Sequence, residues 1–593
     1  DSEFTCVPLT VPLDHYAAEG ETIQLVYAVH PADGERKAMF LVVTGGPGPS
    51  GLAAADFYME SYDPRIPEHF DIVFFDQRGV GLSGGLQCPQ AAVAYYRTDA
   101  RAETPEQEAA LIAAAQTFAQ DCIAEMGPTN LLPYLSTAQA IEDLEDFRRA
   151  LGVDKFWLYG ESYGTQFAQT YAAAYPQRLA GLILDGTVDL TLSGPDFYAQ
   201  QAQAFNDTLV ATLEACNADP ACAADVGSDA LAVYDDLASR LARAPLPFDF
   251  PLPSGSTARR TFTLADLEAA TAGYLYSEGE RMILQRAIAA AAHGDLAPLA
   301  RILYDSLGLD PETLEAVPDP TYSDGAYYAI ECSDYAYFSG TPAERAWAYV
   351  RAGDAVDANV PRLSSIFYGD LPCVFWPATP PTARPAPLVA QGIPTLVLGA
   401  TADPATPVAN GEAVYRRLAD GYLITVQGGP HVTFAWGNPC PDDLVTAFLV
   451  EGTLPEQKET VCAGAVAADY VPLPPADAAE FAGPLEALKS ADDEIYYLPE
   501  YYMWDLETPT AVGCPYGGTL QFEPSDEGAR FTLNGCAFSA GFVMTGMGAY
   551  DYGADRFTLD VAVSGLAEGH LLYTRESDGE ARVEGIYDGQ EFR

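Results

Sequence analysis

The sequence predicts an α/β domain on a mostly parallel sheet, interrupted by a helical insertion and followed by a β-rich domain. Three observations lead to this prediction. Short apolar segments alternate with helical ones up to about residue 189, the alternation returns near residue 394, and short strands with alternating polar and apolar residues dominate after residue 471. The chain, at 593 residues, is also too long for one ordinary domain.

Five apolar segments in the first part are strand candidates: residues 24–30, 38–44, 71–76, 155–160 and 179–185. Residues 137–152 predict a helix, which Ser136 or Thr137 can cap at its start and Gly152 can end. A second helix is expected over residues 163–175, after the fourth strand. Apolar strands that alternate with helices indicate a parallel sheet covered on both faces.

The strand pattern stops in an alanine-rich, helical stretch that contains a proline-rich loop at 245–253. We expect this stretch to be a cap inserted into the sheet domain. Strands resume at 394–399 and 422–427. The predicted division is a first α/β core part, a helical cap insertion, a second core part and a C-terminal all-β, sandwich-like domain, at residues 1–189, 190–377, 378–470 and 471–593.

The charge of the chain excludes some partners. Lys and Arg number 30 against 84 Asp and Glu, which gives a net charge of −54 at pH 7. Such a surface repels nucleic acid and anionic membranes. No apolar stretch is long enough for a transmembrane helix, so we expect no nucleic acid partner and no membrane insertion.

Eleven cysteines occur, and none forms a C-x-x-C pattern of a zinc or redox site. Several lie at short separations in loop-like sequence, which favours disulfides and an oxidising, secreted or periplasmic location. The sequence begins at Asp1 without a leader-like segment, so it would be either a mature form or a chain without a signal. The expected pairs, which leave Cys6 over, are Cys88–Cys122, Cys216–Cys222, Cys332–Cys373, Cys440–Cys462 and Cys514–Cys536.

Residues 160–164 (GESYG) form the pattern G-x-S-x-G between an apolar strand and a helix. The glycines permit a sharp, strained turn that lifts the serine hydroxyl off the sheet edge, with the N-terminus of the helix behind it. We therefore predict that Ser162 is a nucleophile.

A serine nucleophile needs a base, and the base needs an acid to orient it. With this kind of turn the chain order is serine, acid, histidine. Of the six histidines, only His431 lies in a glycine-rich loop after the strand at 422–427, so it is the predicted base. Asp403, after the strand at 394–399, is the predicted acid, and Asp185, at the end of the preceding core strand, is its rival.

Acyl transfer also needs two N–H groups that bind the developing oxyanion. One is expected from Tyr163, directly after the nucleophile. The other is expected from Gly46, in the glycine-rich loop 44–48 that follows the strand at 38–44.

Taken together, these residues carry a resemblance to a known family. The chain resembles the proline iminopeptidase and tripeptidyl aminopeptidase family of α/β-hydrolase serine exopeptidases, over roughly residues 5–465. Thr44 stands where iminopeptidases usually have histidine, so the resemblance leans towards the tripeptidyl branch. The motifs are VPLDHY, TGGPGPSG, DQRGVGLSG, GESYGTQFAQTYAAAYP, AIECSD, LPCVFWP, DPATP, GGPH and GTLPEQKETVC.

The resemblance implies an exopeptidase that acts near the free N-terminus of a peptide, without metal or cofactor. Such an enzyme must recognise an ammonium group, so carboxylates are expected near the nucleophile. The candidates are Glu331 and Asp334 in the insertion and Glu161 beside the serine.

Two other functions remain open from the sequence. A carboxylesterase or lipase would use the same three residues, because esters and amides share the tetrahedral intermediate. A non-catalytic surface or carbohydrate binder would act through the C-terminal β-domain. The acid-rich insertion favours peptides, since a lipase would need an apolar lid.

Overall fold

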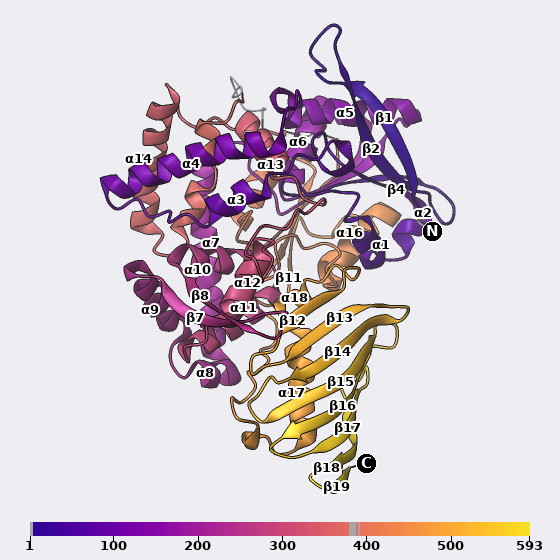
Figure 1. Cartoon of the computed structure of the whole chain (residues 1–593). Coiled ribbons are helices and arrows are strands. Elements are labelled where there is room, and N and C mark those ends of the chain that lie inside the picture. The colour runs from indigo at the N-terminus through magenta and orange to yellow at the C-terminus, as the bar shows by residue number, and fades with distance from the viewer. Residues whose placement is uncertain (1–3, 379–386, 390–391, 593) are drawn as a thin grey trace. The chain divides into compact units, whose positions relative to one another are not determined.

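The computed structural model describes residues 4–378, 387–389 and 392–592 (Figure 1). The chain packs as two compact units. The first consists of Asp1–Thr212, Leu275–Glu278 and Val317–Ala468, and the second of Leu213–Tyr274, Gly279–Ala316 and Asp469–Arg593. The division predicted from the sequence has borders at residues 189, 377 and 470. The two packed units are instead each built from three separate stretches of the chain, and residues of the predicted insertion occur in both. Among the described residues, no helix has the length and apolarity to cross a bilayer.

The first unit contains the predicted α/β sheet, with nine strands in the order β1-β2-β4-β3-β5-β6-β9-β10-β11. Strand β1 pairs antiparallel with β2, and β2 pairs antiparallel with β4. The other seven strands, β3, β4, β5, β6, β9, β10 and β11, run parallel to one another. The strands are Thr5–Pro12, Thr22–His30, Ala38–Val43 (β3), Phe70–Phe75 (β4), Phe156–Glu161 (β5), Leu179–Asp185 (β6), Thr395–Ala400 (β9), Gly421–Val426 (β10) and Glu459–Cys462 (β11).

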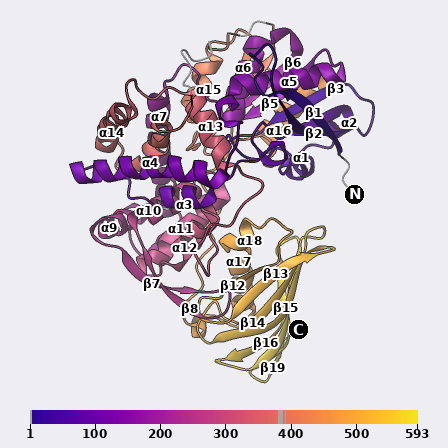
Figure 2. The ribbon, with the colours of Figure 1, turned by 45° about the horizontal axis from the view of Figure 1, so that its top comes forward.

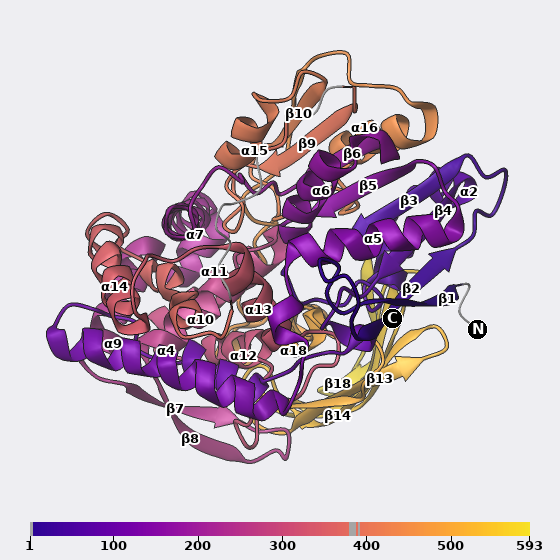
Figure 3. The same cartoon turned by 90° about the horizontal axis from the view of Figure 1, so that it is seen from above.

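Helices cover both faces of this sheet, as its apolar strands require. On one face, α5 (Thr137–Leu151) and α6 (Tyr163–Ala174) pack in a core that includes Phe147, Leu158 and Phe167 (Figure 3). The other face packs against α1, α2 and α16. The remaining helices of the sheet domain are α1 (Ala55–Ser61), α2 (Arg65–His69), α15 (Val408–Tyr415) and α16 (Pro439–Glu451).

The ends of α5 follow from its sequence. The Ser136 side chain accepts the Gln139 N–H at the first turn, and Gly152 at the last turn has a φ of 68°, a conformation that favours glycine.

Part of the helical insertion belongs to the first unit. Its helices α13 (Asp324–Asp334) and α14 (Pro342–Asn359) and the start of α7 (Gly194–Ala218) share an aromatic core with Tyr163. Helices α3 (Pro89–Tyr96) and α4 (Pro105–Met126), which precede the predicted insertion, belong to the same core. The core contains the disulfides Cys88–Cys122 and Cys332–Cys373. Helical layers therefore pack directly against the residue that follows the predicted nucleophile.

The second unit combines the rest of the insertion with the C-terminal region. Eight antiparallel strands form one sheet, β12 to β19 in sequence order (Figure 2). In place of the second layer of a sandwich, helix α17 (Pro484–Tyr496) packs on the sheet through Leu488, Ala491 and Ile495. The strands are Thr510–Gly513, Thr519–Ser525, Gly528–Cys536, Phe542–Asp551, Arg556–Gly565, Gly569–Arg575, Ala581–Tyr587 and Gln590–Phe592.

Ion pairs join two of the three sequence segments of this unit, Gly279–Ala316 and Asp469–Arg593. Arg286 pairs with Glu494 and Arg301 with Glu500, and all four side chains are mostly buried. The predicted proline-rich loop at 245–253 is wrong, because Phe248 and Phe250 alternate into the interior as part of strand β7. The elements are α8 (Pro220–Val226), α9 (Ala230–Arg243), β7 (Leu246–Pro251), β8 (Thr257–Phe262), α10 (Leu264–Gly273), α11 (Glu278–Ala292), α12 (Ala297–Ser306), α17 (Pro484–Tyr496) and α18 (Pro499–Tyr502).

Five disulfides are present, and they join the pairs expected from the sequence, with Cys6 free and exposed. Chains with this many disulfides belong to oxidising compartments.

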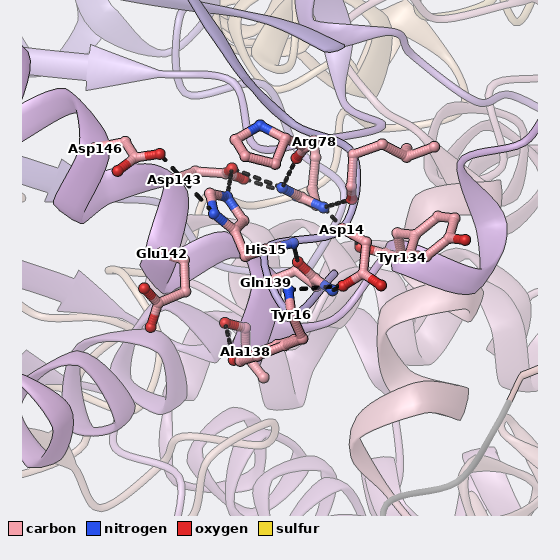
Figure 4. Close-up of polar contacts among 12 residues, drawn as sticks. Asp14, His15, Tyr16, Arg78, Tyr134, Ala138, Gln139, Glu142, Asp143 and Asp146 are labelled. Atoms are coloured by element: carbon pink, nitrogen blue, oxygen red, sulfur yellow. Dashed lines mark hydrogen bonds and ion pairs between the residues drawn. The ribbon is translucent and has the colours of Figure 1, made fainter. Parts of the chain in front are cut away.

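A buried arginine connects three separate segments of the first unit (Figure 4). Arg78 is fully buried and donates to both carboxylate oxygens of Asp143, at 2.7 and 2.6 Å. It also donates to the carbonyls of Leu13 and Tyr134. His15 contacts the same Asp143 carboxylate at 2.7 Å. The motifs VPLDHY and DQRG therefore meet at one ion pair on helix α5.

We expect Asp143→Asn to lower the free energy of unfolding by about 3 kcal/mol or more, because it leaves the buried Arg78 charge without its counter-ion. Urea unfolding followed by tryptophan fluorescence measures the change. The control is Asp99→Asn, which removes the partner of Arg101, a pair with both side chains partly exposed. Equal stability of the two variants would contradict the importance of this pair.

Candidate active site

Ser162 lies at a strained turn between β5 and α6, with φ 51° and ψ −122°. Close backbone contacts explain both glycines of the motif. A Cβ on Gly160 would lie 2.2 Å from the Gly164 carbonyl oxygen, and one on Gly164 would lie 2.2 Å from the Val43 carbonyl oxygen. The turn thus forms because no side chain separates α6 from the sheet.

The structure brings the predicted acid and base together. Nδ1 of His431 lies 2.9 and 3.0 Å from the two carboxylate oxygens of Asp403. Asp403 is buried and also accepts the N–H groups of Ala405 and Thr406, together with the Thr406 hydroxyl at 2.8 Å. The carboxylate is therefore fixed by its own loop and can orient the imidazole.

Helix α7 supports this acid loop from the insertion. Gln201 donates to the Ala405 carbonyl at 3.0 Å, and Thr208 donates to the Ala402 carbonyl at 3.3 Å. The loop that carries Asp403 is consequently held on both sides of the aspartate.

Asp185, the rival acid, makes different contacts. Its carboxylate accepts the N–H groups of Thr433 and Phe434 at 2.9 and 2.8 Å, and its main-chain carbonyl accepts the Ser162 N–H at 2.8 Å. Burial raises the pKa of Asp185 to about 6, against the lowering effect of these hydrogen bonds and of His431. Its geometry suits a residue that positions the histidine loop, and the contacts of His431 favour Asp403 as the acid.

The loop expected to supply the oxyanion N–H lies against the nucleophile. A Cβ on Gly45 would lie 2.8 Å from Cβ of Ser162, so this position excludes a side chain. Gly46 follows, with a φ of 96°, and is joined to Pro47 by a cis peptide bond. Ser50 donates to Asp76 at 2.5 Å and closes the far side of the loop. Gly46 in this loop and Tyr163 at the start of α6 stay our predicted donors.

Glu161 supports the same loop. Its carboxylate accepts the Gly45 N–H at 3.3 Å and the Tyr58 hydroxyl. Burial raises the pKa of Glu161, against the lowering effect of the Tyr58 hydrogen bond. These contacts suit a residue that positions the loop better than one that binds a substrate amine.

The other two acid candidates lie on α13. Asp334 accepts the Thr137 N–H at 3.2 Å, at the first turn of α5, and Gln166 at 2.9 Å. Glu331 is 5% exposed and accepts the Tyr198 hydroxyl at 3.0 Å. The structure places both on α13, the helix that packs in one core with Tyr163.

Two further residues were missed from the sequence. Asp370 is fully buried, and its Oδ2 accepts the Tyr337 hydroxyl at 2.5 Å. Burial raises the pKa of Asp370 to about 6, against hydrogen bonds from Tyr337 and Tyr198. Tyr276 contacts His431 directly. Neither Asp370 nor Tyr276 belongs to a sequence motif that predicts a catalytic role.

Charges around His431 favour its protonated form. Burial lowers the pKa of His431, but the charge and hydrogen bond of Asp403, with the charges of Glu161 and Asp185, outweigh burial and raise it above 6.5 overall. In the described part of the chain, no three His, Cys, Asp or Glu side chains gather in a way that could hold a metal ion.

Comparisons with known proteins place the chain among α/β hydrolases. Residues 39–225 match the family described as alpha/beta hydrolase fold, and residues 363–462 match the TAP-like protein family. Serine protease Hip1 of Mycobacterium tuberculosis is 30% identical over 471 residues, which cover 76% of this chain and 86% of that protein.

Two further relatives carry different names. Carboxylesterase B of Mycobacterium tuberculosis is 30% identical, with 76% of this chain and 85% of that protein covered. Tripeptidyl aminopeptidase of Streptomyces lividans is 26% identical, with 77% and 83% covered. Peptide and ester chemistry are therefore both represented among the relatives.

We expect Asp403→Asn to lower kcat by about ten-thousandfold, because the imidazole loses the carboxylate that orients it and stabilises its charge. The hydrolysis of a small chromogenic ester measures kcat. The matched control is Asp505→Asn, since Asp505 holds a similar turn through the Thr508 N–H and hydroxyl. A wild-type rate for Asp403→Asn, with the ~10,000-fold loss found in Asp185→Asn instead, would show that the acid is misassigned. A smaller loss in Asp185→Asn fits its contacts with the Thr433 and Phe434 N–H groups.

The raised pKa of His431 gives a pH dependence with a definite sign. A general base must be neutral, so kcat/KM falls as the pH drops through the pKa of His431. We expect the midpoint of this acid limb above pH 6.5, and at a lower pH in any active Asp403→Asn preparation, because the main raising charge is removed. A wild-type midpoint clearly below 6.5 would contradict the electrostatic account.

Proposed function

We infer a function from one premise: the chain belongs to the α/β-hydrolase family of serine hydrolases that includes serine protease Hip1 and tripeptidyl aminopeptidases. We propose that this serine hydrolase is an exopeptidase that cuts peptides near a free N-terminus. The supporting observation is the contact of His431 with Asp403, in the chain order and loop positions that a Ser162 nucleophile requires.

In the proposed mechanism, Ser162 Oγ attacks the scissile carbonyl while His431 takes its proton. The N–H groups of Gly46 and Tyr163 bind the oxyanion of the tetrahedral intermediate. His431, as imidazolium stabilised by Asp403, then gives the proton to the leaving amine, and an acyl-enzyme forms on Ser162. Water, activated by the same histidine, releases the acyl group and regenerates the serine.

Recognition of a free N-terminus is assigned to the carboxylates of α13. Glu331 is our first choice, because its carboxylate is almost buried on α13, the helix that packs in one core with Tyr163. A buried carboxylate favours a nearby cation, and an ammonium group supplies one. Asp334 and Glu161 stay weaker candidates, because both already bind main-chain N–H groups.

The main alternative is a carboxylesterase, the activity in the name of one relative. Ester and amide hydrolysis share every step of the proposed mechanism, so only substrate recognition separates them. The carboxylates beside Tyr163 favour a substrate with a positive charge. We further place the protein outside the cytosol, secreted or periplasmic, because its five disulfides require oxidising conditions.

We expect acetylation of the substrate amine to lower kcat/KM by roughly tenfold to a hundredfold or more, since a hydrogen bond to a charged group contributes about 1.5–3 kcal/mol. Glu331→Gln should shrink this preference. Matched free and acetylated tripeptidyl substrates give the measurement, and Glu344→Gln, at the exposed start of α14, is the control.

Equal turnover of both substrates by the wild type would reject the exopeptidase and favour the esterase. A preference that survives in Glu331→Gln would leave the exopeptidase in place and move the amine site to another carboxylate.

A further inference from the structure

Tyr276 reaches the predicted base from the helical insertion. It lies in Leu275–Glu278, a segment between α10 and α11 that packs with the first unit. Its main-chain carbonyl accepts the His431 N–H at 2.7 Å. Its ring stands at 79° to the imidazole, with the two ring centroids 5.4 Å apart. Both the backbone and the ring of the histidine are therefore in contact with one residue.

The Tyr276 ring is itself held. Phe205, a buried residue of α7, packs against it with centroids 5.9 Å apart and an angle of 68° between the rings. Tyr276 nevertheless keeps 37% of its surface exposed. A ring with a fixed neighbour and an open side can restrain the imidazole without closing the site to substrate.

The other contacts of the imidazole leave it free to rotate about its Nδ1 hydrogen bond. Asp403 and Thr406 both act at Nδ1, and the Gly186 backbone lies close to Cε1, where a Cβ would be 3.3 Å away. An imidazole held at Nδ1 can still swing about that contact. Such a swing moves Nε2, the nitrogen that must take the Ser162 proton.

We propose that Tyr276 is a positioning residue for His431, whose ring keeps Nε2 directed at Ser162. This inference rests on the proposed Ser162–His431 chemistry and is independent of exopeptidase specificity. The hydrogen bond to the His431 N–H comes from the main chain. A substitution at position 276 therefore removes the ring contact and leaves the loop anchored.

The test compares Tyr276→Ala and Tyr276→Phe with a control, Trp347→Ala. Trp347 lies on α14 and has the same 37% exposure. Two readings need no peptide specificity: the rate of labelling by a small fluorophosphonate, and kcat and KM for p-nitrophenyl acetate. Thermal unfolding checks the fold of each variant. Should Tyr276→Ala be unstable, Tyr276→Leu fills the space without a flat ring and takes its place.

We expect Tyr276→Ala to slow both labelling and kcat by roughly tenfold to a hundredfold, the effect of a small misplacement of a reacting group. KM should change little, because the ring acts through His431. Tyr276→Phe and Trp347→Ala should keep wild-type rates. The downfield proton resonance of the His431–Asp403 hydrogen bond should broaden in the alanine variant and persist in the phenylalanine variant.

Three results would overturn the proposal: wild-type labelling of Tyr276→Ala, an equal loss in Tyr276→Phe, or a rise in KM with unchanged labelling. The second would assign the effect to the hydroxyl, and the third would make Tyr276 a substrate contact. A wild-type protein that does not label at all would instead reject the Ser162–His431 mechanism, so the two failures can be told apart.

Discussion

Asp185 connects the two loops on which the proposed chemistry depends. Its carbonyl accepts the Ser162 N–H at the strained turn, and its carboxylate accepts the N–H groups of Thr433 and Phe434, two and three residues after His431. One residue at the end of β6 thus fixes the nucleophile and the base relative to each other. The carboxylate is fully buried, and these N–H groups, with the hydroxyls of Thr433 and Tyr159, offset its desolvation. The proposed role of Asp185 at the end of β6 is therefore to position the two loops, and not to transfer a proton.

Residues of the helical insertion contact the loops that carry the predicted acid and base. Gln201 and Thr208 of α7 hold the loop of Asp403, and Tyr276 holds the loop and ring of His431. The α/β sheet alone positions Ser162 through its glycines, because that turn depends only on close backbone packing. The acid and the base, which lie on longer loops, need support from outside the sheet. This difference explains why the insertion contacts the second half of the site more than the nucleophile.

Much of the fold and the main site could be predicted because local chemistry decides them. Apolar strands, the capped helix α5 and the G-x-S-x-G turn each follow from residues a few positions apart. Tyr276 and Asp370 could not be found in this way, because their roles come from contacts between segments more than a hundred residues apart or from burial among tyrosines. Strand β7 was missed because its prolines suggested a loop, while alternating phenylalanines decided the structure. In the second unit, strand content was predictable, but the use of a helix as its second layer depends on packing.

The contacts of the three candidate amine-binding acids distinguish them from one another, which the composition of the chain cannot do. In a chain with 84 acidic residues, the presence of a carboxylate near a serine carries little information. Glu161 binds the Gly45 N–H and so holds the oxyanion loop, and Asp334 binds the first turn of α5, where a negative charge also complements the helix dipole. Both would lose a structural contact by turning to a substrate. Glu331 accepts the hydroxyl of the buried Tyr198 side chain at 3.0 Å. Glu331 therefore stays the first candidate for the proposed amine site, because the other two carboxylates have main-chain contacts to keep.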